Sequence, residues 1–184
     1  ARRYLNRLKL LENSVELIWV NFQPWLPKGI EFPCDTREIL VRGPYPGNLL
    51  RFDHIPKDLD ETRWWIYTDT ADVIFQGPIP DLDQFGPEIG IIASSEGEFF
   101  FQNGVWKTVF SRVAPDLDSL KHRPIVCMGT WAMKGYWAKE MLKFVRATAK
   151  QIPGLQNDQP LFNLWLGNKR WVELDALFCT LHRN

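Results

Sequence analysis

Apolar runs of strand length alternate with segments of helical periodicity along this 184-residue chain. The clearest helix is predicted over residues 134–151, where one face carries Trp137, Met141, Phe144, Val145 and Thr148. Strands are predicted over residues 16–22, 38–41, 63–68, 89–93, 125–128, 171–174 and 177–181, and further helices over 1–13, 48–54, 82–85 and 159–166. This alternation is typical of one three-layer α/β/α domain, residues 1–184, with a mostly parallel, Rossmann-like sheet.

The charge balance argues against some classes of partner. Lysine plus arginine and aspartate plus glutamate each total 22, so no whole-molecule field would gather nucleic acid. No run approaches the ~18 apolar residues of a membrane-spanning helix, and residues 1–6 lack the apolar stretch of a signal peptide. We therefore expect a soluble chain without a transmembrane segment, which recognises its partners locally.

The three cysteines bear on the compartment. Cys34, Cys127 and Cys179 are far apart in the sequence and form no C-x-x-C pair, which argues against a zinc site or a disulfide framework. This pattern favours the cytoplasm, and a lumenal domain of the Golgi or the endoplasmic reticulum is the alternative.

Two aspartates follow the apolar run 63–68 (RWWIYT). In an open α/β sheet the ligand lies beyond the carboxyl ends of the strands, which draws attention to Asp69 and Asp72. Carboxylates at this spacing can turn toward one point and hold Mg²⁺ or Mn²⁺, whose other positions water and phosphate oxygens fill. The alternative is that they cap the turn, since aspartate is common just after strands.

The wider segment 64–85, WWIYTDTADVIFQGPIPDLDQF, resembles the strand, acidic motif and exit of glycosyltransferases with the GT-A fold. Residues 124–135 (PIVCMGTWAMKG) are similar to that family's strand-to-helix turn, and residues 157–163 (NDQPLFN) to its D-Q-x-x-x-N helix start. The chain departs from the family's usual residues at Ala71 and Cys127. It begins at the helix that follows the family's first strand, so we expect that strand to be missing.

The resemblance implies a metal-dependent transfer of a sugar from a nucleotide diphosphate sugar, a UDP-sugar in the simplest case, to a carbohydrate acceptor. It assigns Asp69, Asp72 and His182 as ligands of Mn²⁺ or Mg²⁺. It also places Thr68 and Thr70 beside the donor.

Other residues are expected to contact the substrates. Gly129 and Thr130 would lie beside the sugar, where a residue without a side chain allows close approach, unless they form a plain strand-to-helix turn. Arg51 could reach the donor phosphate, with solvated surface as the alternative. Asp158 is the candidate general base of an inverting reaction, or a sugar-positioning group in a retaining one, and Gln159 would contact the donor. The alternative role for Asp158 is the cap of the helix that begins there.

The tryptophans can serve as core residues or as platforms for ligands. Trp64, Trp65 and Trp171 lie in strand runs and are predicted to be core. Trp131 is better placed to stack on an acceptor sugar, with core packing as the alternative.

Two other functions stay open. A nucleotidyltransferase of similar fold would also use a metal and a nucleotide, but such enzymes usually open with a glycine- and arginine-rich loop that this sequence lacks. A catalytically degenerate protein that binds carbohydrate or nucleotide without turnover is supported by the departures at Ala71 and Cys127.

Overall fold

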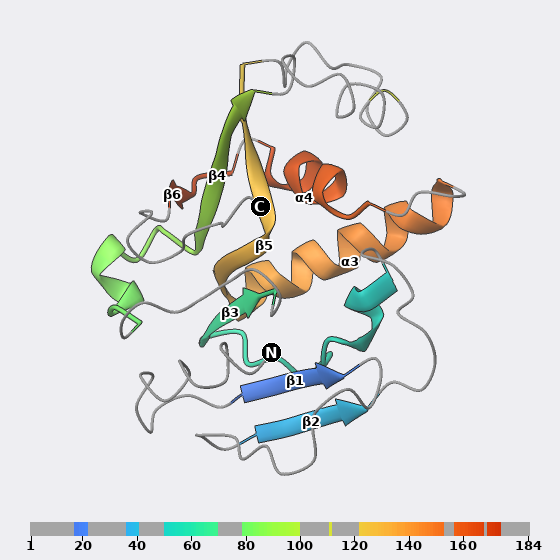
Figure 1. Cartoon of the computed structure of the whole chain (residues 1–184). Helices are drawn as coiled ribbons and strands as arrows, with labels where there is room; N and C mark the ends of the chain where they lie inside the picture. The colour runs from blue at the N-terminus through green and yellow to red at the C-terminus, as the bar shows by residue number, and fades with distance from the viewer. Residues whose placement is uncertain are drawn as a thin grey trace.

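The computed structural model describes residues 17–21, 36–40, 50–69, 79–99, 111, 122–152, 157–167 and 169–173. Helices α3 (Gly135–Gln151) and α4 (Gln159–Leu166) lie beside a four-stranded sheet in a mixed α/β arrangement (Figure 1). In these parts of the chain, no helix combines the length and the apolar character needed to cross a membrane.

The four-stranded sheet has the order β3 (Trp64–Thr68), β5 (Pro124–Lys134), β4 (Ile91–Phe99) and β6 (Val172–Glu173). β5 pairs antiparallel with both β3 and β4, whereas β4 and β6 run parallel. The predicted mostly parallel, Rossmann-like sheet is therefore wrong for these strands. The prediction took apolar runs as a sign of parallel strands, because such strands are buried on both faces. A central antiparallel strand between two layers is also buried on both faces, so it gives the same apolar run.

A second sheet consists of β1 (Leu17–Asn21) and β2 (Thr36–Leu40), which run parallel. The strands predicted over 16–22 and 38–41 are thus confirmed with small shifts of their ends. Among the strands that the structure describes, neither β1 nor β2 pairs with the four-stranded sheet.

The larger core lies between the four-stranded sheet and the two helices, on what we call the helix-side face. The predicted helix over 134–151 is confirmed, but its buried face differs from the predicted one. Ala138 and Leu142 are buried, whereas Trp137 and Phe144 are only half-buried and lie at the edges of that face. The sheet residues that enter this core are Ile91, Ala93, Val126, Met128, Trp131 and Met133.

A short 3-10 helix, η2 (Leu50–His54), is fastened to α3 by Arg146. Arg146 Nη2 donates hydrogen bonds to the carbonyl oxygens of Phe52 and Ile55, and its Nε lies 3.4 Å from Asp53 Oδ1. The ring of Phe52 is thereby held in the helix-side core, where it is completely buried.

The opposite face of the sheet is covered by η3 (Leu82–Phe85), and we call it the η3-side face. Its smaller core joins Leu82 and Ile89 to Ile92 and Ala132. In the part of the chain that the structure describes, α3 and α4 both pack on the helix-side face, and a 3-10 turn packs on the other.

Strand β5 continues past its predicted end at residue 128. Ala93 pairs with Trp131 and Ser95 pairs with Val126, so the four residues of β5 between these two pairs lie opposite one residue of β4. The extra residues form a bulge that includes Gly129, and a bulge bends a strand and re-aims its side chains. The predicted strand-to-helix turn at Gly129 is therefore wrong: the turn into α3 comes at Gly135 instead.

Candidate functional site

Asp69, the first residue after β3, packs against the bulge of β5. Its backbone N–H donates to Gly129 O at 2.8 Å, and the Tyr67 hydroxyl donates to Asp69 Oδ1 at 3.1 Å. A Cβ at position 129 would lie 3.0 Å from Asp69 Oδ2, which is closer than packed side chains normally approach. The glycine thus gives the carboxylate room to lie over the neighbouring strand.

The pairing of β3 with β5 decides which predicted residues share a face. Thr68 lies opposite Thr130, so these two point to the same side of the sheet. Side chains alternate along a strand, so Asp69 and Gly129 belong to the helix-side face, while Thr68 and Thr130 point to the η3 side. The four residues therefore meet at one place in the sheet, but they do not all line one surface of it.

Two buried side-chain atoms in the described region lack a hydrogen-bond partner, and they belong to consecutive residues of β5 whose side chains point to opposite faces of the sheet. They are Thr130 Oγ1 and Trp131 Nε1. Both residues are almost fully buried. Buried polar atoms are normally satisfied, so β5 keeps one unused donor on each face of the sheet.

Aromatic rings support the Asp69 carboxylate from the helix side. The ring of Tyr67 stacks on that of Trp131 with centroids 5.3 Å apart and planes 9° from parallel, and Phe52 lies 5.8 Å from Tyr67. Trp131 is 3 % exposed, so core packing holds for it and stacking on an acceptor sugar does not. Sequence reasoning missed Tyr67, although strand alternation already puts residues 67 and 69 on one face.

A second group of predicted residues lies at the start of α4. Asp158 is 2 % exposed and occupies the N-cap position, but its side chain makes no capping hydrogen bond. The carboxamide oxygen of Asn157 accepts from Gln159 N at 3.2 Å instead. The side chain of Gln159 donates to Glu96 Oε1 on β4 at 2.7 Å. The capping role considered for the Asp158 side chain is therefore wrong.

Asn163 joins α4 to β5, and sequence reasoning did not single it out. Its Oδ1 accepts from Val126 N and its Nδ2 donates to Val126 O, both at 2.8 Å. The same amide nitrogen donates to Gln159 O at 2.9 Å. The side-chain amide makes the hydrogen bonds to Val126 that a neighbouring strand would otherwise make. It thereby holds α4 against β5, the strand that carries Gly129.

Several predicted site residues cannot be compared with the structure. Thr70, Asp72 and His182 lie outside the described residues, and Arg51 lies in η2 with its side chain outside the description. Within the described ranges, no three histidine, cysteine, aspartate or glutamate side chains gather at one point that could hold a metal ion. Of the three predicted ligands, Asp69 alone falls in those ranges.

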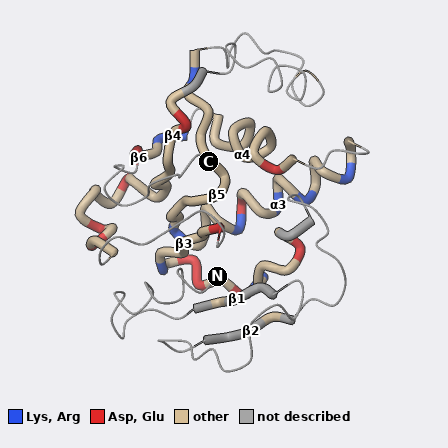
Figure 2. Tube along the Cα trace, in the orientation of Figure 1, with Lys and Arg blue, Asp and Glu red and all other residues tan. Residues whose placement is uncertain are grey.

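Charges are spread over the described part of the molecule without a face of one sign (Figure 2). No model of a known protein family matches the chain, and no curated protein matches it in sequence.

Proposed function

We propose that this chain is a metal-dependent glycosyltransferase that moves a sugar from a nucleotide diphosphate sugar, with UDP-sugars as the first candidates, to a carbohydrate acceptor. The observation that carries the proposal is the Asp69 carboxylate, held at the exit of β3 over a glycine of the next strand. The exit of β3 is where the carboxylate comes against the neighbouring strand β5. It is also where the resembling family carries its acidic motif.

The surroundings of Asp69 fit a divalent cation. The Tyr67 hydroxyl orients the carboxylate through Oδ1, as the outer partners of metal-binding carboxylates do. Two carboxylate oxygens offer about four acceptor positions, so a carboxylate that accepts hydrogen bonds can also bind a cation. In the proposal Asp69 and Asp72 hold Mn²⁺ or Mg²⁺, with His182 as a further ligand. The bound cation would neutralise charge on the diphosphate.

The start of α4 supplies the acid–base candidate of the proposal. Asp158 would serve as the general base of an inverting reaction, or would position the sugar in a retaining one. Asn157 provides the cap, so the Asp158 carboxylate is not needed for that purpose. Gln159 and Gly129 would contact the donor, as would Thr70 and Arg51, whereas Thr68 and Thr130 would contact it only through their backbone, because their side chains point to the η3 side.

Calorimetric titration of UDP-, GDP- and CDP-glucose with and without Mn²⁺ tests the donor site. One nucleotide class should bind, and binding should require the metal. Asp69→Asn keeps the shape of the side chain but removes its charge. Donor binding should weaken by at least about a hundredfold, because loss of a residue that only supports a metal ligand costs at most about that factor. Asp83→Asn is the matched control, because Asp83 is an exposed aspartate on the η3-side face, and this variant should bind the donor as the unaltered chain does.

Release of free nucleotide separates a transferase from a degenerate binding protein. A transferase should slowly hydrolyse its bound donor in the presence of Mn²⁺, and Asp158→Asn should slow this release without weakening donor binding to the same degree. Metal-dependent binding with no release of nucleotide would rule out the transferase and leave a binding protein. Equal binding of all three donors with and without metal would rule out both the transferase and the metal-dependent binding protein.

A further inference from the structure

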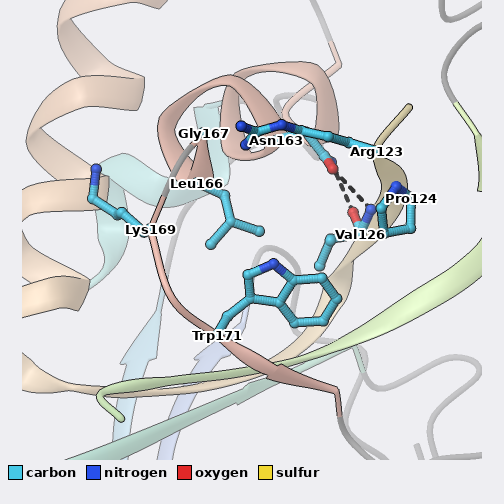
Figure 3. A pocket seen from close by; sticks show the side chains of 8 residues that line it. All are labelled: Arg123, Pro124, Val126, Asn163, Leu166, Gly167, Lys169 and Trp171. Carbon is cyan, nitrogen blue, oxygen red and sulfur yellow. Dashed lines mark hydrogen bonds between the residues drawn. The ribbon is translucent and has the colours of Figure 1, made fainter. Parts of the chain in front are cut away.

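A cavity of about 290 Å³ opens between the start of β5, the end of α4 and the residues that lead into β6 (Figure 3). Ligand sites commonly measure ~300–1,000 Å³, so this one suits a single ring. None of the residues that hold the Asp69 carboxylate lines it. The cavity is therefore separate from the proposed donor site.

Trp171 provides a flat apolar wall. Its indole is turned into the hollow, toward Leu166 and Val126 (Figure 3). Trp171 is half-buried and packs against the helix-side core, which fixes the ring in place. A broad amphipathic ring of this kind can stack on the C–H face of a sugar.

Arg123 brings a guanidinium to the lining of the cavity. Lys169 also lines the cavity, but its Nζ donates to Trp165 O at 3.0 Å and lies 3.3 Å from Glu140 Oε1. None of the described residues that line the cavity is acidic. A guanidinium has five N–H donors, so Arg123 can keep an existing partner and still bind a carboxylate through two parallel hydrogen bonds.

The remaining polar wall is already committed. The amide of Asn163 faces the cavity but is bonded to both backbone groups of Val126. A ligand that enters the cavity therefore meets the flat indole of Trp171 and the guanidinium of Arg123, while the Lys169 ammonium is already bonded to other groups. A neutral apolar ring would leave the guanidinium without a new partner, and a simple anion would leave the indole uncovered.

We propose that this cavity binds a pyranose that carries a carboxylate, with the ring on Trp171 and the carboxylate on Arg123, and that it is the acceptor subsite of the transferase. The acceptor role rests on the proposed function, whereas the ring and its charge follow from the cavity alone. Val126 precedes Gly129 by three positions on β5, on the order of 10 Å, so a sugar here would lie close to the donor end of the sheet.

Ligand-observed NMR titrations of methyl β-D-glucuronide and methyl β-D-glucoside test the cavity with the whole chain. The glucuronide should bind at least about tenfold more tightly, the factor expected for a charged hydrogen bond. Arg123→Gln should remove that preference. Arg170→Gln is the matched control, because this neighbouring arginine is exposed and does not line the cavity. Trp171→Leu, which keeps an apolar side chain for the core, should weaken both sugars.

Equal affinity for the two sugars, or a preference that survives Arg123→Gln, would overturn the proposal. Asp69→Asn separates it from the proposed function, because this change should abolish donor binding and leave glucuronide binding intact. If the wild-type chain binds the glucuronide through Arg123 but no nucleotide sugar, the acidic-sugar site stands and the acceptor role falls. If it binds donor but not glucuronide, the cavity proposal fails alone.

Discussion

The two faces of the four-stranded sheet are held together in different ways. On the helix-side face, Asn163 and its partner Val126 are both buried, and the rings of Phe52, Tyr67 and Trp131 pack beneath Asp69. On the η3-side face the main polar contact joins Lys134 to Asp83, whose side chain is 68 % exposed.

This difference determines what each contact is worth. A buried hydrogen bond cannot be replaced by water when one partner is removed, so its loss carries the full desolvation cost. An exposed ion pair competes with water in either state and contributes little. The helix-side face, which carries Asp69, should therefore tolerate far less change than the η3-side face.

The largest loss is expected for Gly135→Ala, where β5 turns into α3. A Cβ at this position would lie 1.9 Å from the backbone oxygen of Asp60, and backbone cannot move aside as a flexible side chain can. The free energy of unfolding should fall by about 4 kcal/mol or more, as measured by urea denaturation.

Gly97→Ala is the control for this change. Gly97 has a φ of +71° with open space around it, so alanine there should cost about 1–2 kcal/mol from backbone strain alone. Equal losses at Gly97 and Gly135 would show that the close packing at the start of α3 does not matter.

Asn163→Leu should have the next largest effect. It removes the partner of both backbone groups of Val126 in a buried setting, which should cost about 3 kcal/mol of unfolding free energy. Asn157→Ala removes a half-buried helix cap and should cost about 1 kcal/mol by the same measurement. If the two variants lose the same unfolding free energy, burial does not determine how much the Asn163 amide stabilises the fold.

Gly129→Ala should alter function more than stability. The new Cβ forces the end of the flexible Asp69 side chain to shift, while alanine suits a strand better than glycine by roughly 0.5–1 kcal/mol. The unfolding free energy should therefore change by less than about 1 kcal/mol. Metal-dependent donor affinity should nevertheless fall clearly, as measured by calorimetry. Unchanged affinity would argue against Asp69 as the anchor of the donor site.

Asp83→Asn on the η3-side face should give the smallest change. The hydrogen bond from Lys134, and then that from Trp64, lowers the pKa of Asp83, so the charged form is favoured in the folded protein. Such a group stabilises the fold above its ordinary pKa of about 3.9, and the effect disappears as the pH falls through the lowered value.

The melting temperature of Asp83→Asn should therefore lie slightly below that of the unaltered chain at neutral pH, and the difference should disappear once the pH falls below the lowered pKa of Asp83. High salt should also remove the difference. A loss as large as that of Asn163→Leu, or one that is independent of pH, would contradict the contrast between the two faces.

Local elements were predictable because their signals are local. Helix α4 has the predicted bounds and α3 nearly so, and β3 begins one residue later than predicted. Asp69 and Gly129, assigned to one site through the resemblance, do lie against each other. Strand direction was not predictable, because an apolar run is equally compatible with parallel and antiparallel neighbours when both of its faces are covered.

The core assignments of Trp64, Trp65 and Trp171 are confirmed, and only the preferred role of Trp131 as a platform for a sugar is wrong, for a related reason. Before the bulge, Val126 and Met128 face the helices, and after it Trp131 and Met133 do, so the alternation changes phase within one strand. A shift of one residue moves every later side chain to the other face. Trp131 therefore lies in the core, which was the alternative considered for it, and Trp171 packs against the same core as predicted while it also lines the cavity.

The order of residues was enough to specify where helices form and which carboxylate follows the β3 strand, because these depend on neighbours within a few positions. The direction of the strands, the bulge at Gly129 and the pairing of Asn163 with Val126 came only with the tertiary structure. Each of them joins segments far apart in the chain, and such contacts depend on how whole layers pack rather than on any local pattern.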